Sequence, residues 1–290
     1  MRPRVGMIGL GVMGSAMSSH LLAAGFTVTG YDIDEEALRR HAESGGRAAA
    51  SAAEVASGSD VIVTSLPGKA ALKDAVQGIA STAEPGLIVV ETSTLPLDTK
   101  LRARDALAGC GAVLLDCPLS GTGAQAREKD LVVYVSGDDE TAKERAAPVL
   151  DAFSRGRHDA GRFGNGTRLK IVANLLVAVH NVATAEALLL ARAAGLDPDL
   201  TLRAVGDGAG SSRMFQVRGP MMASGDYDDA TMRLDLFAKD LEIIAAYAAG
   251  LGSPTPLFDA SADIYKAALA EGRGAQDTAS VYAVLEEGTT

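Results

Sequence analysis

The chain has 290 residues, of which 47% are hydrophobic and 22% are charged, and these proportions exclude a disordered or collagen-like protein. Its formal net charge of −10 argues against a surface for nucleic acid and against an electrostatic membrane anchor. The two cysteines, Cys110 and Cys117, form no CxxC motif, so we interpret both as reduced thiols. The histidines show no metal-ligand spacing, and we expect no metal site. The N-terminus lacks signal-peptide features, which predicts a cytoplasmic protein.

Apolar segments in the first half of the chain predict buried parallel strands. They are Val5–Ile8, Thr27–Tyr31, Val61–Ser65, Leu87–Glu91, Ala112–Asp116 and Leu131–Ser136. Ala-rich stretches between them predict helices, for example Gly14–Ala24, Glu35–Ser44 and Leu97–Ala108. Asp34 is a suitable N-cap for the second of these helices. The alternation predicts an α/β Rossmann domain, that is, a doubly wound parallel sheet with helices on both faces.

The second half of the chain carries little strand signal and is rich in Ala and Leu. Its predicted helices are broken at Gly195–Pro198, Gly206–Gly210, Gly219–Pro220, Gly250–Pro256 and Gly272–Gly274. We therefore expect the Rossmann domain over residues 1–163 and an all-α C-terminal domain, for substrate binding and oligomerisation, over residues 164–290. The second domain begins with a long interdomain helix over about residues 166–194.

Polar residues such as Asn174, His180 and Glu186 interrupt this long helix, which favours a soluble helix over a membrane span. The helix would be about 40 Å long, which is more than one small domain can cover. Its apolar residues lie around most of its circumference. We therefore expect a homo-oligomer in which partner subunits complete the burial of this helix.

A glycine-rich loop follows the first strand and precedes the first helix. It consists of Gly9, Leu10, Gly11, Val12, Met13 and Gly14. In a GxGxxG motif the glycines permit a tight turn, a close approach of a pyrophosphate and close helix–strand packing. A glycine-rich turn without a ligand is the alternative, but the order of strand, motif and helix favours dinucleotide binding. The N-terminus of the helix offers its N–H groups to the phosphates.

Asp32 ends the second predicted strand, where an acidic residue accepts hydrogen bonds from the adenosine ribose. Its alternative role is a helix cap, which Asp34 can fill instead. Ile33 offers no cation to a 2′-phosphate, and Arg39 and Arg40 lie farther along the next helix. We therefore expect NAD to be preferred over NADP.

Six segments resemble the signature sequences of the β-hydroxyacid dehydrogenase family. They are Gly9–Met17, Ser65–Pro67, Glu91–Thr94, Asp116–Gly123, Gly164–Asn174 and Lys239–Leu241. The resemblance covers essentially the whole chain and implies dimers or tetramers with a helical domain like that of 6-phosphogluconate dehydrogenase. It implies that Leu66, Pro67 and Thr94 bind near the nicotinamide, and that Lys239 reaches both cofactor and substrate. Thr122 stands where the family has a second glycine, and Asp130 where a small polar residue is common.

The resemblance implies a hydride transfer between NAD and a small carboxylate-bearing substrate. Ser120 and the backbone N–H groups of Gly121, Thr122 and Gly123 are suited to hold the carboxylate. Lys170 is the expected proton shuttle, since it can donate as an ammonium and accept as an amine. Asn174, one helical turn later, is expected to orient Lys170 or the substrate hydroxyl.

Two alternatives use the same scaffold: an imine or carbonyl reductase, and a non-catalytic NAD-sensing module. Lys170 argues against the first alternative, because those relatives replace the lysine, and a sensor has no need of Lys170, Asn174 and Ser120 together. The substrate stays open among 3-hydroxyisobutyrate, glycerate or tartronate semialdehyde, serine-like 3-hydroxyacids, threonate-like sugar acids and a sulfonated analogue. The direction of the reaction also stays open.

Overall fold

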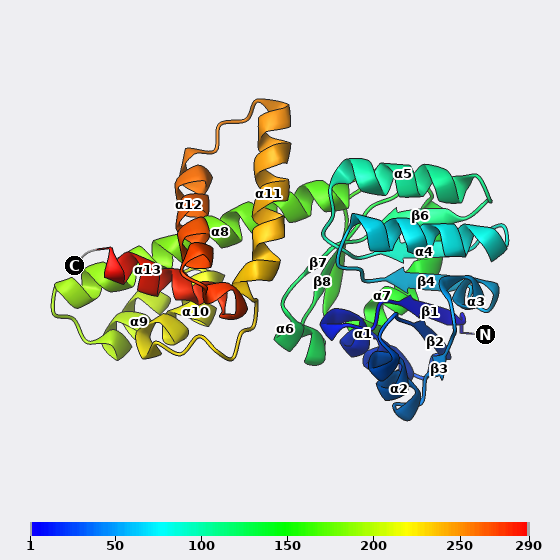
Figure 1. Ribbon diagram of the computed structural model, residues 1–290, viewed down its shortest axis with the longest axis horizontal. Helices are drawn as coiled ribbons and strands as arrows, with labels where there is room; N and C mark the ends of the chain where they lie inside the picture. Colours follow the sequence, from blue (N-terminus) through cyan, green and yellow to red (C-terminus); the bar gives the residue numbers. More distant parts are fainter. Residues whose placement is uncertain (1, 289–290) are drawn as a thin grey trace. The chain divides into compact units, whose positions relative to one another are not determined.

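The computed structural model describes residues 2–288, and the chain forms two compact units, Met1–Lys170 and Ile171–Thr290 (Figure 1). The division falls inside one continuous helix, α8 (Asn165–Ala193). The boundary expected from the sequence, between residues 163 and 164, lies just before this helix. The structural division comes later because the first turns of α8 pack with the first unit.

The first unit is built on a six-stranded sheet with the strand order β3-β2-β1-β4-β5-β6. Every neighbouring pair in this sheet is parallel. The strands are β1 (Val5–Ile8), β2 (Val28–Tyr31), β3 (Arg47–Ala48), β4 (Val61–Thr64), β5 (Ile88–Glu91) and β6 (Val113–Asp116). The doubly wound parallel sheet expected from the sequence is confirmed. Strand β3 was not predicted, because its two residues are exposed and form no apolar run.

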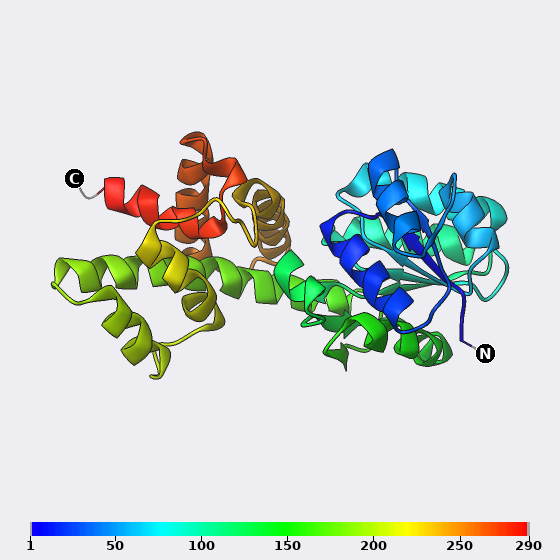
Figure 2. The same cartoon turned by 90° about the horizontal axis from the view of Figure 1, so that it is seen from below.

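Helices cover both faces of this sheet. They are α1 (Val12–Ala23), α2 (Glu35–Glu43), α3 (Ala52–Ser57), α4 (Lys69–Thr82), α5 (Leu97–Ala108), α6 (Gly123–Arg127) and α7 (Glu140–Phe153). Met17 of α1 and Leu150 of α7 belong to one hydrophobic core, whereas Ile79 of α4 and Leu107 of α5 belong to another. Figure 2 shows these helix layers on opposite sides of the sheet.

The segment Leu131–Ser136 does not join the parallel sheet, contrary to expectation. It forms β8 (Val132–Val135), which lies between β7 (Leu119–Ser120) and β9 (Gly156–Asp159) in a separate three-stranded sheet. Strand β8 is antiparallel to β7 and parallel to β9. Strands β7 and β8 are joined by residues 121–131, in which the only helix is the five-residue α6. Parallel neighbours need a longer crossover.

The second unit consists of helices over its described residues. After α8 come α9 (Pro198–Gly206), α10 (Arg213–Ser224), α11 (Leu234–Leu251), α12 (Pro256–Ala270), the short 3₁₀ turns η1 (Arg273–Ala275) and η2 (Thr278–Ser280), and α13 (Val281–Glu287). Gly219–Pro220 is not a break, because Pro220 lies inside α10. A Cβ on Gly219 would lie 2.8 Å from a methyl carbon of Leu202, so α9 packs closely on α10 next to the proline.

Helix α8 supplies Ile171, Ala178, Val182, Ala185 and Leu188 to the hydrophobic core of the second unit. By length and composition it is the one described helix that passes a test for a membrane span, a test that core helices of soluble proteins also pass.

Apolar side chains are exposed along one face of α8, and they lead to a testable prediction. Leu169, Val172 and Leu176 are 43%, 57% and 46% exposed, and their spacing places them on one side of the helix. We expect wild-type protein to elute as a dimer or tetramer in size-exclusion chromatography with light scattering, and Val172→Glu to shift it to smaller species. Ile33→Glu is the control, because Ile33 is exposed but lies in the other unit. A stable wild-type monomer at micromolar concentration contradicts the prediction.

Candidate active site

The loop Gly9–Gly14 has the geometry that a pyrophosphate requires. A Cβ on Gly14 would lie 1.9 Å from the carbonyl oxygen of Gly9, so only glycine permits α1 to pack this closely on β1. A Cβ on Gly11 would meet nothing within 4 Å, so this part of the loop faces open space. Gly11 is the N-cap of α1 and supplies no side-chain hydrogen bond. The first N–H groups of α1 are therefore free of side-chain caps and suited to phosphate oxygens.

Asp32 lies directly after β2 and holds the loop in place. Its Oδ2 accepts a hydrogen bond from the backbone N–H of Leu10 at 2.6 Å, and its Oδ1 accepts one from Asp34 at 2.9 Å. A carboxylate has about four acceptor positions, so Asp32 retains capacity for ribose hydroxyls. Asp34 caps α2 by accepting from the backbone N–H of Glu36 at 3.0 Å, which confirms its expected role. The residues present therefore fit a dinucleotide.

The segments expected near the nicotinamide are joined by a buried serine. The backbone N–H of Leu66 donates to Ser93 Oγ at 2.8 Å, and the backbone N–H of Ser93 donates to Glu91 Oε1 at 2.7 Å. Leu66 and Pro67 follow β4, and Thr94 follows β5, so all three lie at the carboxyl ends of neighbouring strands. This edge of a parallel sheet is where ligands of α/β proteins bind.

The segment Ser120–Gly123 lies against the glycine-rich loop. Ser120 ends β7, and Gly123 begins α6. A Cβ on Gly123 would lie 2.5 Å from Val12 Cγ1, so the two predicted binding segments are in contact. Gly121 has a φ of +137°, a conformation that favours glycine. The structure therefore brings the predicted substrate segment and the predicted phosphate loop together within the first unit.

Thr122 and Asp130, the two departures from the family pattern, belong to one hydrogen-bonded turn. Thr122 is the N-cap of α6, and its backbone N–H donates to Gln125 Oε1 at 3.1 Å. Gln125 Nε2 in turn donates to Asp130 Oδ2 at 3.0 Å. Arg155 forms an ion pair with Asp130 at 2.7 Å. Asp130 thus fixes the turn that carries Thr122, a role that the sequence analysis did not identify.

The first turn of α8 is attached to the carboxyl end of β6. Asp116 accepts two hydrogen bonds from Thr167, one from its backbone N–H and one from its Oγ1, each at 2.8 Å. A Cβ on Gly166 would lie 2.7 Å from the carbonyl oxygen of Asp116, so glycine is required for this approach. Lys170 follows Thr167 by three residues and lies on the same side of the helix. Thr167 and this role of Asp116 were not predicted from the sequence.

The remaining predicted residues lie in the second unit. Asn174 is 6% exposed, and its Nδ2 donates to Asp240 Oδ2 at 2.9 Å. Lys239 Nζ lies 3.8 Å from Asp240 Oδ1. The amide nitrogen of Asn174 therefore has a partner that the sequence analysis did not name. The sequence did point to Asp240, because it is the central residue of the Lys239–Leu241 segment.

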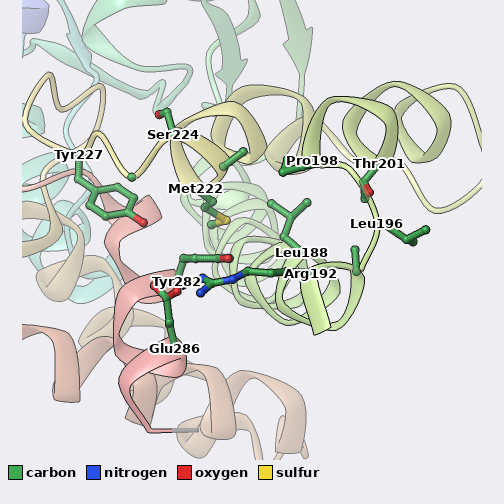
Figure 3. Close-up of a pocket in the computed structure, with 13 residues that line it drawn as sticks. Leu188, Arg192, Leu196, Pro198, Thr201, Met222, Ser224, Tyr227, Tyr282 and Glu286 are labelled. Atoms are coloured by element: carbon green, nitrogen blue, oxygen red, sulfur yellow. Dashed lines mark hydrogen bonds and ion pairs between the residues drawn. The ribbon is translucent and has the colours of Figure 1, made fainter. Parts of the chain in front are cut away.

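A separate cavity of about 360 Å³ lies within the second unit (Figure 3). Its walls include Leu188, Met222, Tyr227 and Tyr282, and an ion pair between Arg192 and Glu286 lies beside it. It includes none of the predicted site residues. Among residues 2–288, no group of three or more His, Cys, Asp or Glu side chains is arranged to hold a metal ion.

Two family models match adjoining parts of the chain. The NAD binding domain of 6-phosphogluconate dehydrogenase matches residues 4–166. The model described as NAD-binding of NADP-dependent 3-hydroxyisobutyrate dehydrogenase matches residues 164–285.

Individual relatives match over nearly the full length. An L-threonate dehydrogenase of Cupriavidus necator is 35% identical over 98% of this chain and 97% of its own. A 3-sulfolactaldehyde reductase of Escherichia coli is 33% identical over 96% of this chain and 94% of its own. The crystal structure of a 3-hydroxyisobutyrate dehydrogenase from Salmonella typhimurium has a TM-score of 0.86 and 33% identity, and covers 97% of this chain and 99% of its own. The chain therefore belongs to the β-hydroxyacid dehydrogenase family and is an NAD(P)-dependent oxidoreductase.

Proposed function

We propose that this enzyme transfers a hydride between NAD and the hydroxyl-bearing carbon of a small β-hydroxyacid or its semialdehyde. One observation carries the proposal: Thr167, in the first turn of α8, is hydrogen-bonded to Asp116 at the carboxyl end of β6. Lys170 therefore comes one turn after a residue that is bound to the edge where the sheet strands end. The glycine-rich loop follows β1 at the same edge. A proton donor and a dinucleotide site at one edge of a sheet support a dehydrogenase over an NAD sensor.

Residues of the chain bind the cofactor and the substrate. Bound NAD supplies the hydride acceptor, and NADH the hydride. The first N–H groups of α1 bind the phosphates, and Asp32 accepts from the adenosine ribose. A ribose 2′-phosphate would meet the negative charge of Asp32, which supports NAD over NADP. Ser120 and the N–H groups that follow it bind the substrate carboxylate.

Lys170 moves the proton. In the oxidative direction the hydroxyl proton passes to the neutral amine of Lys170 as the C–H hydride leaves and the C=O bond forms. In the reductive direction the ammonium of Lys170 donates its proton to the carbonyl oxygen. Asn174 cannot titrate, and its hydrogen bond to Asp240 supports an orienting role. Lys239 is proposed to contact the cofactor and the substrate.

The relatives' names narrow the substrate class to be tested. L-threonate has hydroxyl groups at both the α and the β carbons, and 3-sulfolactaldehyde carries a sulfonate. Both compounds are small, anionic and more polar than 3-hydroxyisobutyrate. Together they support an acid of three or four carbons with a second polar substituent.

The experiment is a panel of 2- and 3-hydroxyacids, including L-threonate, glycerate, L-serine and 3-hydroxyisobutyrate, assayed with NAD and with NADP. Semialdehydes and a cyclic imine are assayed with NADH and NADPH, and all reactions are followed at the NADH absorbance. We expect turnover with NAD on at least one of the polar acids. Binding of NADH without turnover of any acid or semialdehyde would favour the sensing module. Reduction of a cyclic imine in place of the acids would favour the imine reductase.

Thr122 is expected to set the substrate range. Its side chain stands where the family has a glycine, in the segment proposed to hold the carboxylate. We expect Thr122→Gly to raise kcat/KM for 3-hydroxyisobutyrate relative to L-threonate. Gln125→Ala is the control, because it removes the hydrogen bond to the backbone of Thr122 but leaves the side chain of Thr122 in place. If Thr122→Gly ranks the substrates as wild type does, Thr122 does not set the substrate range and serves only as a helix cap.

A further inference from the structure

A row of polar side chains is buried where three neighbouring strands of the main sheet end. Thr64, Glu91 and Asp116 are the last residues of β4, β5 and β6, and they lie opposite one another in the strand register. Each of them is 0% exposed. Two carboxylates in a water-excluded site need a compensating charge, because an unpaired buried charge is strongly unfavourable.

Lys100 of α5 supplies that charge. Its side chain is 0% exposed, and its Nζ lies 2.9 Å from Asp116 Oδ1 and 3.8 Å from Glu91 Oε1. Burial opposes the charged form of Lys100, but the attraction of Asp116 and Glu91 outweighs it and holds the pKa of Lys100 above its ordinary value. The ammonium therefore stays charged between the two carboxylates.

From Asp116 the contacts lead to α8. The same carboxylate that accepts from Lys100 also accepts from the backbone N–H and the Oγ1 of Thr167. Ser136 Oγ donates to Asp116 Oδ2 at 3.1 Å and accepts from the backbone N–H of Gly166 at 2.9 Å. Two successive N–H groups at the start of α8 are thus held by one buried cluster.

From Glu91 the contacts lead to the nicotinamide segments. Thr64 Oγ1 donates to Glu91 Oε2 at 2.7 Å, and Ser93 donates to Glu91 through its backbone N–H and its Oγ. Ser93 Oγ accepts from the backbone N–H of Leu66. Lys100 is therefore the central member of a chain of contacts between Leu66 on one side and the first turn of α8 on the other, joined to Asp116 by a hydrogen bond and to Glu91 by an ion pair.

We propose that Lys100 is a positioning residue, which sets the separation between the nicotinamide segment at Leu66 and the turn of α8 that precedes Lys170. The proposal rests on the proposed function of Lys170 as proton shuttle. Lys100 touches neither substrate nor cofactor and acts through Asp116 and Glu91. Without the ammonium these two buried carboxylates repel each other. The bonds to Thr167 or to Ser93 then weaken, and the two segments move relative to each other.

The test compares Lys100→Met with Lys143→Met. Methionine matches the length of lysine without its charge. Lys143 is a suitable control because it is 7% exposed, and its Nζ also pairs with two carboxylates, those of Glu140 at 2.8 Å and Asp159 at 3.0 Å. It lies on α7, whose core is on the other face of the sheet, and its ion pairs with Glu140 and Asp159 involve no residue of the strand-end row. Glu140 and Asp159 are exposed, whereas Glu91 and Asp116 are buried. Loss of a paired lysine from a helix therefore affects both variants, whereas loss of the charge between two buried carboxylates affects only Lys100→Met.

Three readouts separate positioning from a merely structural role: kcat and KM with the best acid of the panel, NADH affinity by fluorescence titration, and amide hydrogen exchange of residues 165–171. A displacement of about 1 Å at a reacting group can cost about 10²-fold in rate. We expect Lys100→Met to lower kcat by up to that factor, with KM and NADH affinity near wild type, and to speed exchange at the first turn of α8. Lys143→Met should leave kcat and this exchange unchanged.

A second pair of variants keeps the proposal testable if Lys100→Met does not fold. Thr167→Val removes the Oγ1 hydrogen bond to Asp116 and retains the shape of the side chain, and Thr167→Ser restores the hydroxyl. We expect Thr167→Val to lower kcat and to speed exchange in the same turn, and Thr167→Ser to recover both. Wild-type kcat and exchange in Thr167→Val, or equal effects of Lys100→Met and Lys143→Met, would overturn the proposal.

Failure of this proposal is distinguishable from failure of the proposed function. If Lys170→Ala retains turnover, Lys170 is not the proton shuttle. The positioning of Lys170 by Lys100 then has no catalytic role. If Lys170→Ala loses turnover while Lys100→Met and Thr167→Val behave like wild type, the shuttle stands and the positioning role of Lys100 is wrong. If no acid of the panel is turned over, the exchange comparison still decides whether Lys100 holds the start of α8.

Discussion

Replacing Lys170 with alanine is expected to lower kcat by 10²–10⁴-fold, because a positioned proton donor typically contributes about that factor. The change corresponds to about 3–5 kcal/mol of activation free energy. NAD affinity should barely change, since the glycine-rich loop follows β1 and Asp32 follows β2, both far from α8 in the sequence. Both quantities are measured on the same protein, by NADH titration and by steady-state turnover.

Two controls sharpen the result for Lys170. Lys170→Arg should recover little activity, since arginine keeps the positive charge but holds its proton too tightly to act as a base. Arg168→Ala changes a charged residue of the same turn, whose side chain donates to Asn165 on the exposed surface, and should leave kcat unchanged. Oxidation by wild type should accelerate with rising pH as the ammonium of Lys170 loses its proton, and Lys170→Ala should lose this dependence. Near-normal turnover in Lys170→Ala contradicts the proton shuttle.

The second large effect is expected at Asp32. Loss of a hydrogen bond to a charged group costs about 1.5–3 kcal/mol, so Asp32→Ala should weaken NAD binding by roughly 10- to 100-fold. The structure adds a second reason, because the same substitution removes the acceptor of the Leu10 backbone N–H and loosens the glycine-rich loop. Discrimination against NADP should fall at the same time, because the carboxylate no longer repels a 2′-phosphate.

Asp34→Ala is the matched control for Asp32. It removes an equal charge two residues away and costs a helix cap of α2, worth about 1 kcal/mol of stability. It leaves the hydrogen bond between Asp32 and Leu10 intact, so NAD affinity should stay near wild type. A wild-type enzyme that prefers NADP, or equal losses of NAD affinity in both variants, would show that Asp32 does not select the cofactor.

The features predicted correctly are those that neighbouring residues in the chain decide. Apolar runs separated by Ala-rich helices sufficed for the strands β1, β2, β4, β5 and β6, because a strand buried on both faces is predominantly apolar. The cap by Asp34 follows from its position just before a helix. The glycine-rich loop was recognised from the sequence because its glycines are needed locally. Only glycine at position 14 allows α1 to pack closely on Gly9.

The features that were missed depend on partners distant in the sequence. Nothing near Leu131–Ser136 indicates that it pairs with Leu119–Ser120 in a second sheet, because apolar alternation does not specify the partner strand. Asn174 and Asp240 are 66 positions apart, and only the folding of α11 against α8 brings them together.

The buried cluster at the strand ends is the clearest case. Lys100 stands among charged residues of α5 and looks like a solvated lysine, yet it is 0% exposed. Asp116 and Glu91 are separated from it by 16 and 9 positions. Their carboxylates meet its ammonium because parallel strands end at one edge and α5 packs beside that edge. The sequence by itself determined five strands of the main sheet, the dinucleotide loop and the family. The tertiary structure alone decided which charges are buried together, because desolvation and ion pairing depend on distances in space rather than along the chain.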